Sequence, residues 1–128
     1  MVEQGRPSKR VLIIDDDAAF VQALQARLAK EGLDVRACSY GEQGIADARV
    51  FLPDLVILDV LMPGVHGIHV LSELRRIPVL DKTQIIVISG VLDRENEERV
   101  LRLRAEFVSK SGDAQGIVAK AKRCLGVL

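Results

Sequence analysis

Short apolar runs alternate with amphipathic segments along most of this chain, and this alternation is the main signal of its fold. The runs favour β-strands at five positions, namely Val11–Ile14, Val35–Cys38, Leu55–Leu58, Ile85–Ile88 and Phe107–Ser109. Three of them are continuously apolar, as expected for strands of a parallel sheet that helices cover on both faces.

The segments between these runs repeat their apolar residues with the period of an α-helix. In the first segment the repeat consists of Phe20, Leu24 and Leu28, with Asp17 as the predicted N-cap and Gly32 as the predicted C-cap. Three further apolar faces are formed by Ile45, Ala48 and Leu52, by Val70, Leu71, Leu74 and Ile77, and by Ile117, Ala121, Cys124 and Leu125. Pro53 and Pro78 end the first two of these helices.

A fourth helix is predicted over residues 94–104, where charges of both signs alternate around a few apolar positions. The pattern favours a helix with a solvated face. The alternative is a marginally stable element that shifts when the site changes state, with Val91, Leu92, Val100 and Leu101 as a candidate docking patch.

Five strands alternating with five helices predict an α/β fold with helices on both faces of one parallel sheet. The chain has 128 residues, which suits one domain with one core, here residues 9–128 preceded by a flexible tail of residues 1–8. Ligands of such folds bind at the carboxyl ends of the strands.

Composition excludes several classes of protein. The formal net charge is +0, so no global field attracts the chain to nucleic acid or to a membrane, and aromatic residues make up only 3%. No apolar run approaches the roughly 20 residues that span a bilayer, and the N-terminus lacks the apolar stretch of a signal peptide. Cys38 and Cys124 fit no metal-ligand spacing and are predicted to be buried free thiols in a reducing cytoplasm.

Polar residues stand at the ends of four of the predicted strands. Asp15 and Asp16 follow the first strand, Asp59 the third and Ser89 the fourth, while Lys110 follows the fifth. Parallel strands bring these ends to one edge of the sheet, and carboxylates crowded there repel one another unless a cation is present.

Magnesium suits such a site because it takes hard oxygen ligands and keeps several waters. Asp16 and Asp59 are the predicted direct ligands, Asp15 binds through a water, and the backbone carbonyl of Leu61 completes the set. His66 and His69 are predicted to be surface residues rather than ligands.

The same edge suits phosphoryl transfer. A carboxylate that attacks phosphorus forms an aspartyl phosphate, which makes Asp59 the candidate acceptor. Lys110 and Ser89 would contact the phosphoryl oxygens, and Gly90 leaves room for an incoming group. Each residue alone has a plainer explanation as a cap, a turn or a solvated side chain, so the prediction rests on their order and shared placement.

Four motifs resemble the receiver domain of two-component response regulators: VLIIDDD, PDLVILDVLMPGVHG, IIVISG and FVSK. The resemblance covers about Arg10 to Leu125, and its most specific part joins Asp59 to Met62-Pro63 and Gly67. It implies a flavodoxin-like, doubly wound sheet in the order 2-1-3-4-5 and assigns Asp59 as the phosphoacceptor.

The resemblance also implies the roles of the other residues. Asp15 and Asp16 match the acidic pair that binds Mg²⁺, Lys110 matches the family's lysine, and Ser89 and Phe107 match its two switch residues. Phe107 has the alternative role of a core aromatic. A histidine kinase or phosphotransfer protein would be the donor, and an output domain or protein the downstream partner. Direct contact with nucleic acid or membrane is not expected, and a homodimer is left open.

Three departures from the family pattern carry expectations of their own. Ser111 replaces a proline that usually follows the lysine in a cis peptide. A cis bond before a non-proline residue costs roughly 2.5–4 kcal/mol, so a trans bond is expected, with the loop eased by Gly112. Leu103-Arg104 replaces the Gly-Ala that usually precedes the fifth strand, so the end of the fourth helix departs from the family pattern. Apolar Leu61 and Val91 flank the site, which predicts slow self-dephosphorylation.

The leading hypothesis is a phosphorylation-dependent signalling switch that catalyses only its own phosphoryl transfer and dephosphorylation. The alternative is a receiver-like binding module that no longer cycles phosphate. A hydrolase would need a second carboxylate two residues after its nucleophile, where Leu61 stands. A flavin module would need a phosphate-binding loop after the first strand, where three aspartates repel phosphate.

Overall fold

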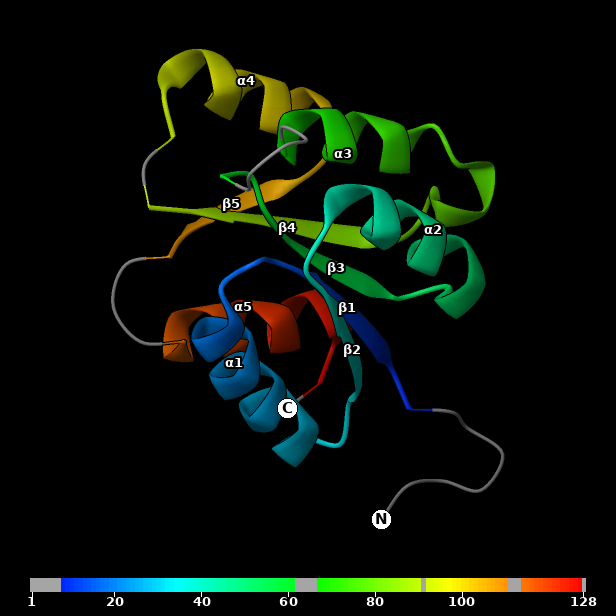
Figure 1. Cartoon of the computed structure of the whole chain (residues 1–128), viewed down its shortest axis with the longest axis vertical. Helices are drawn as coiled ribbons and strands as arrows, with labels where there is room; N and C mark the ends of the chain where they lie inside the picture. The colour runs from blue at the N-terminus through cyan, green and yellow to red at the C-terminus, as the bar shows by residue number, and fades with distance from the viewer. Residues whose placement is uncertain (1–7, 62–66, 91, 111–113, 128) are drawn as a thin grey trace.

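The computed structural model describes residues 8–61, 67–90, 92–110 and 114–127. Five parallel strands form one sheet in the order β2-β1-β3-β4-β5, which confirms the predicted architecture. The strands are β1 (Arg10–Ile14), β2 (Asp34–Cys38), β3 (Leu55–Asp59), β4 (Gln84–Ser89) and β5 (Glu106–Ser109). The helices are α1 (Ala18–Lys30), α2 (Gly41–Phe51), α3 (Gly67–Arg75), α4 (Arg94–Arg102) and α5 (Gln115–Leu125), with a 3-10 turn, η1 (Pro78–Leu80), before β4 (Figure 1).

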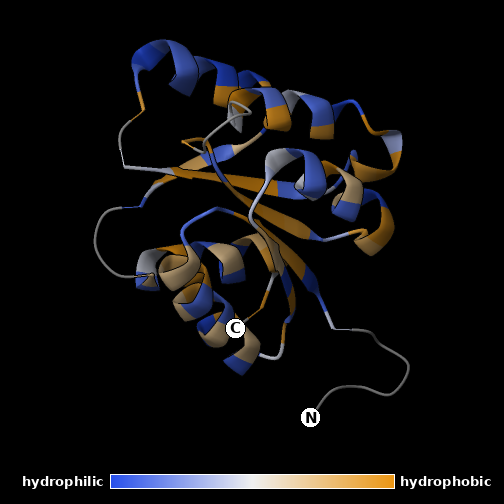
Figure 2. Cartoon of the chain, viewed as in Figure 1, coloured by the Kyte–Doolittle hydropathy of each residue, from blue (hydrophilic) through white to orange (hydrophobic). Residues whose placement is uncertain are grey.

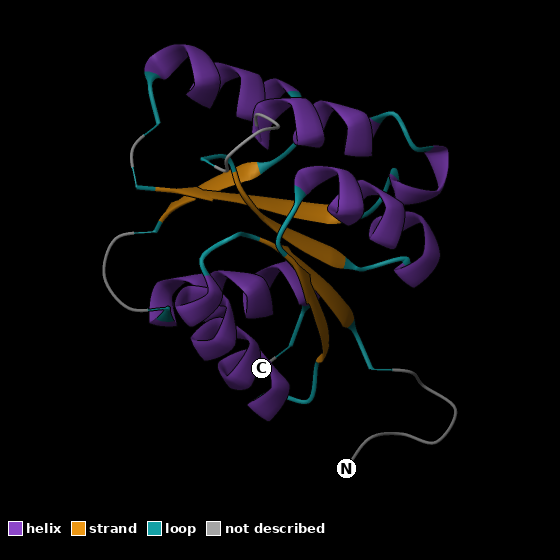
Figure 3. Ribbon diagram, viewed as in Figure 1, coloured by secondary structure: helices purple, strands orange, loops and turns teal. Residues whose placement is uncertain are grey.

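The sheet separates two hydrophobic cores, because alternate residues of each strand point to opposite faces. On β1, Leu12 and Ile14 pack with α2, α3 and α4, whereas Val11 and Ile13 pack with α1 and α5. Figure 3 shows the same division, with α1 and α5 on one side of the sheet and the other three helices on the other. The central strand β3 is buried at every residue, and this places its last residue, Asp59, in a largely buried position.

The two ends of α1 show how far local signals fix a boundary. Asp17 caps its start as predicted, since its Oδ1 accepts a hydrogen bond of 3.1 Å from the backbone N–H of Phe20. The C-cap is Glu31, one residue before the predicted Gly32. Gly32 follows with φ of +83°, a left-handed conformation that glycine adopts without steric cost.

The apolar face of α2 differs from the prediction at its last turn. Phe51 is the buried residue, 3% exposed, whereas Leu52 is 44% exposed. The chain leaves the helix at Leu52, which adopts φ of 53° just before Pro53, so the helical period no longer sets the direction of its side chain.

Other local predictions hold in part. Helix α3 ends at Arg75, so Ile77 lies beyond it, although its side chain is buried beside η1. Cys38 and Cys124 are free thiols but only half-buried, because each lies at the margin of a core. His69 is exposed as predicted, and His66 lies outside the described residues.

Helix α4 is the most polar element, as its blue colour in Figure 2 shows. It ends at Arg102, two residues earlier than predicted, and Val100 is its one buried residue. The predicted docking patch is therefore wrong at Val100, which packs in the core, while Leu101 is 69% exposed. Leu92 is half-buried, and Val91 lies outside the described residues.

Two arginines, Arg75 of α3 and Arg104, hold the end of α4, where Leu103-Arg104 replaces the Gly-Ala of the family pattern. Arg104 adopts φ of 58°, a strained conformation for a non-glycine residue. Its guanidinium contacts the Oδ1 of Asp81 at 3.1 Å. Arg75 donates hydrogen bonds to the carbonyl oxygens of Leu103, Arg104, Leu80 and Thr83. These bonds tie the end of α4 to the turn that enters β4.

The remaining expectations concern membrane-spanning segments and the N-terminal tail. No helix within the described ranges is long and apolar enough to cross a membrane. Residues 1–7, which make up most of the expected tail, lie outside the described part of the chain.

Gly67 allows α3 to begin directly against the end of β3. Its N–H donates to the carbonyl of Val60 over 3.3 Å. A Cβ added at Gly67 would lie 2.1 Å from the Cα of Val60 and 2.9 Å from the carbonyl oxygen of Asp59. Both neighbours are backbone atoms, so relief would require movement of the chain beside the site.

We predict that Gly67→Ala lowers the free energy of unfolding by about 1–3 kcal/mol, the usual cost of overpacking. The matched control is Gly116→Ala in α5, where an added Cβ meets nothing within 4 Å. That change should be neutral or stabilise the helix by up to about 1 kcal/mol. Urea unfolding of both variants tests the prediction, and equal stability of the two would contradict it.

Candidate functional site

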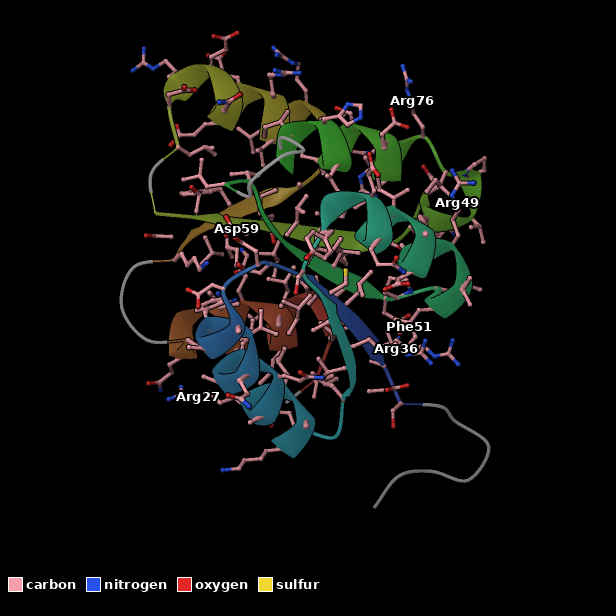
Figure 4. All side chains as sticks on the ribbon, in the orientation of Figure 1. Arg27, Arg36, Arg49, Phe51, Asp59 and Arg76 are labelled. Carbon is pink, nitrogen blue, oxygen red and sulfur yellow. The ribbon has the colours of Figure 1, made fainter. Side chains whose placement is uncertain are left out.

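Three carboxylates meet at the carboxyl edge of the sheet. β1 and β3 are neighbours in which Ile14 pairs with Leu58, so the next residues, Asp15 and Asp59, come to lie side by side. One oxygen from each of Asp15, Asp16 and Asp59 lies within 4.8 Å of the others. Asp15 and Asp59 are 1% and 4% exposed, while Asp16 is open to solvent. Figure 4 shows Asp59 at this end of the sheet.

The ammonium of Lys110 lies among these acids. Its Nζ is 2.9 Å from Asp15 Oδ2, 3.1 Å from Asp59 Oδ2 and 3.8 Å from Asp17 Oδ2. The backbone N–H of Lys110 donates to the carbonyl of Ser89 over 2.9 Å, which extends the pairing of β5 with β4 by one residue. The main chain thus fixes the start of the side chain, and the carboxylates fix its end.

Hydrogen bonds orient the two buried carboxylates. Asp59 Oδ1 accepts from the backbone N–H of Leu61 at 2.9 Å, and Asp15 Oδ1 accepts from that of Asp17 at 2.9 Å. Asp15 Oδ2 differs, because its contact with Lys110 is close enough for an ion pair but lacks the direction of a hydrogen bond. This buried oxygen therefore relies on the charge of Lys110, and a further cation could contact it.

The electrostatics of Asp15 and Lys110 also favour a cation at this edge of the sheet. Burial raises the pKa of Asp15, and the nearby Asp59 charge adds to the rise, against the opposing effects of the Asp17 N–H and of Lys110. Burial alone would lower the pKa of Lys110, but its contacts with Asp15 and Asp59 outweigh burial and raise that pKa. Lys110 stays charged, and ionised Asp15 still costs free energy in the fold, a cost that a divalent cation would relieve.

The donor set fits magnesium. Three carboxylate oxygens at close range are hard ligands, and the exposed side of Asp16 leaves room for the waters that Mg²⁺ retains. The main chain of Leu61 lies beside Asp59 through its N–H. The role of its carbonyl as a ligand stays a prediction.

Ser89 and Phe107 lie where the sequence placed them. Ser89 ends β4 one residue after Ile88, the partner of Asp59 in the sheet, and is fully buried. Open space lies beside Gly90, where an added Cβ would meet nothing within 4 Å. Phe107 is half-buried against the core under α2, α3 and α4, which agrees with either a core or a switch residue.

Several predicted features lie outside the described residues, namely Met62, Pro63, Val91, Ser111 and Gly112. The trans peptide between Lys110 and Ser111 therefore stays a prediction. The position of Lys110 itself is described, and its ammonium contacts the carboxylates of Asp15 and Asp59.

Two residues beside the lysine were not predicted as part of the site. Asp17 was assigned only as a helix cap and Phe20 only as a core residue. The structure places the ring of Phe20 4.6 Å from Lys110 Nζ, measured to the ring centroid. Their place directly after Asp15 and Asp16 was the available signal, because the first turn of α1 must lie beside the carboxyl end of β1.

The fold and the site now allow comparison with known proteins. The model of the response regulator receiver domain family matches residues 11–122. Among solved structures, a CheY-like response regulator receiver domain protein from Methanospirillum hungatei superposes with a TM-score of 0.87 at 24% identity, covering 94% of this chain and 95% of that one. A putative response regulator from Chloroflexus aurantiacus gives a TM-score of 0.83 at 26% identity, covering 94% and 99%.

Similarity in sequence extends to longer proteins. The alkaline phosphatase synthesis transcriptional regulatory protein PhoP of Bacillus subtilis is 30% identical over 121 residues, which cover 92% of this chain and 49% of that protein. The cell cycle response regulator CtrA of Brucella ovis is 32% identical over 112 residues, covering 87% and 47%. The chain spans about half the length of these relatives. From the family match and the shared fold, it follows that this chain belongs to the response regulator receiver domain family.

Proposed function

We propose that this receiver domain is a signalling switch that accepts a phosphoryl group on Asp59 from a phosphohistidine donor. The observation that carries the proposal is the position of Asp59. Its Oδ2 lies 3.1 Å from the ammonium of Lys110, and its carboxylate belongs to a cluster with Asp15 and Asp16 that suits a divalent cation. The proposed nucleophile, the proposed cation site and the charge of Lys110 thus share one edge of the sheet.

The proposed reaction moves one phosphoryl group. A carboxylate oxygen of Asp59 attacks phosphorus, the P–N bond to the donor imidazole breaks, and the imidazole nitrogen keeps the electron pair of that bond. A small phosphodonor would lose a P–O or P–N bond in the same way. Lys110 and Ser89 would then contact the phosphoryl oxygens, so that catalysis consists of positioning and charge stabilisation. The domain catalyses only its own phosphoryl transfer and dephosphorylation.

Asp15, Asp16 and Asp59 would hold Mg²⁺, with the carbonyl of Leu61 as a further ligand. When bound, the ion would neutralise negative charge on the phosphoryl group during transfer. Asp15 has a second role that needs no metal, since it pairs with Lys110 and fixes the direction of its side chain.

The proposed signal is a shift in population between two conformations of Ser89, Phe107 and the face formed by α4, β5 and α5. A histidine kinase or phosphotransfer protein would supply the phosphoryl group. An output domain or a protein partner would respond to the changed face, and a homodimer is one form that the response could take. The polar surface of α4 and its single buried residue support this choice of element.

A receiver-like module that no longer cycles phosphate is the second candidate. The replacement of the usual proline by Ser111 favours it. The contacts of Lys110 with Asp15 and Asp59 argue against it, because they bring the lysine to the acceptor without that proline.

The first prediction of this proposal concerns the acceptor. Incubation with acetyl phosphate or phosphoramidate and Mg²⁺ should add the mass of one phosphoryl group to the intact protein. Asp59→Asn should abolish the gain. Asp93→Asn should retain it, because Asn can still cap α4 through the oxygen that now accepts from the N–H of Asn96. A gain that survives Asp59→Asn, or no gain in the wild type, would defeat the phosphoacceptor role.

A second prediction concerns the cation. Mg²⁺ should raise the free energy of unfolding, by about 2.7 kcal/mol at one hundred times its dissociation constant. Asp15→Asn should lose most of this stabilisation, whereas Asp34→Asn, an exposed acid at the other end of the sheet, should keep it. Denaturant unfolding with and without Mg²⁺ measures the difference. The metal assignment would fail if both variants responded to Mg²⁺ like the wild type.

A third prediction concerns the lifetime of the phosphorylated form. The side chain of Leu61 is 61% exposed beside Asp59 and offers no polar group to orient an attacking water. We expect loss of phosphate over minutes or longer. Leu61→Asn should accelerate the loss by roughly five-fold, the value of one hydrogen bond of about 1 kcal/mol. Phosphate loss from the purified wild type within seconds would rule the prediction out.

A further inference from the structure

The ring of Phe20 is an uncharged neighbour of the Lys110 ammonium. The ring of Phe20 lies below it at 4.6 Å, on the side of α1, while the buried carboxylates contact it at 2.9 and 3.1 Å. We propose that Phe20 is a positioning residue that holds Lys110 at the phosphoacceptor through a cation–π contact. This inference rests on the proposed function, and it explains how the lysine is held in a chain that has Ser111 after it.

The ring of Phe20 is itself held in place. Phe20 lies in the first turn of α1, where its backbone N–H donates to Asp17 Oδ1 over 3.1 Å. Its side chain also packs against the core between α1, α5 and the sheet. The ring therefore has a defined position beside Lys110, whose side chain is only 18% exposed.

An aromatic face has a property that the carboxylates lack. Asp15 and Asp59 belong to the proposed cation site, so a bound divalent ion would share the charge that now holds the lysine. The ring does not bind the ion, and its attraction for the ammonium would persist. Such contacts shift an equilibrium by about two- to thirty-fold, depending on how far the pair is removed from water.

The competing explanation is that Phe20 only fills space in the core. Two substitutions separate the roles. Phe20→Leu keeps an apolar side chain but removes the aromatic face, whereas Phe20→Tyr keeps the face. The chain also offers a matched control in Phe51, whose ring contacts the guanidinium of Arg36 at 4.4 Å at the opposite end of the sheet (Figure 4). Phe51→Leu removes a ring of the same kind far from Asp59.

The first measurement uses NMR of the unphosphorylated protein and needs no phosphodonor. Protons on the carbon next to the Lys110 ammonium should show an upfield ring-current shift, assigned by its loss in Lys110→Arg. The shift should persist in Phe20→Tyr and Phe51→Leu and disappear in Phe20→Leu. Persistence in Phe20→Leu, or absence from the wild type, would overturn the proposal.

The second measurement is the rate of phosphorylation by phosphoramidate at saturating Mg²⁺. Phe20→Leu should reduce the maximal rate by about three- to ten-fold, while Phe20→Tyr and Phe51→Leu should stay near the wild-type rate. Thermal unfolding of each variant checks that the chain remains folded. Equal losses in Phe20→Leu and Phe20→Tyr would mean that packing alone is responsible and would overturn the proposal. A wild type that accepts no phosphoryl group would refute the proposed function, and the NMR shift would then decide the contact by itself.

Discussion

The repulsion among carboxylates at the carboxyl edge of the sheet is the constraint on which the site depends. Two of them, Asp15 and Asp59, are almost wholly buried, and taking charged groups out of water costs several kcal/mol or more unless they are paired. Lys110 reduces this cost by contacting both, yet the pKa of Asp15 remains raised by burial and by its neighbour. The fold therefore keeps its acidic edge in a state that favours a further cation.

The rest of the scaffold compensates for this unfavourable edge. The central strand β3 is buried along its whole length. Apolar packing on both of its faces holds Asp59 close to Asp15 despite the repulsion between their charges. At the opposite end, Arg75 and Arg104 tie the end of α4 to the turn before β4. The N-terminal half of α4 has no buried residue, and the core contact near its start comes from the half-buried Leu92 that precedes it. Few buried contacts in the first half of the helix are typical of segments of low local stability.

Much of this arrangement follows from the sequence, because continuous apolar runs define the strands of a buried parallel sheet to within one residue. The errors occurred where a local period stops being informative. In the sequence, Leu52 continues the helical repeat of apolar residues. Its left-handed backbone turns the side chain toward solvent, and Phe51 is the residue buried in the core instead. The contact of Phe20 with Lys110 was not predicted either. The sequence places Phe20 near the carboxyl end of the first strand, but the contact itself depends on how α1 packs beside the end of β5.

Lys110 keeps its position at the acidic edge although the residue after it departs from the family motif. A proline after the lysine would act on its backbone, but here the backbone N–H of Lys110 is already bonded to the carbonyl of Ser89. The end of the side chain contacts Asp15, Asp59 and Phe20, which come from other parts of the sheet and from α1. Contact with a phosphoryl group on Asp59 would then require the ammonium to exchange one oxygen partner for another nearby. Such an exchange needs only rotations about the bonds of one side chain, so it requires no movement of the main chain at Lys110.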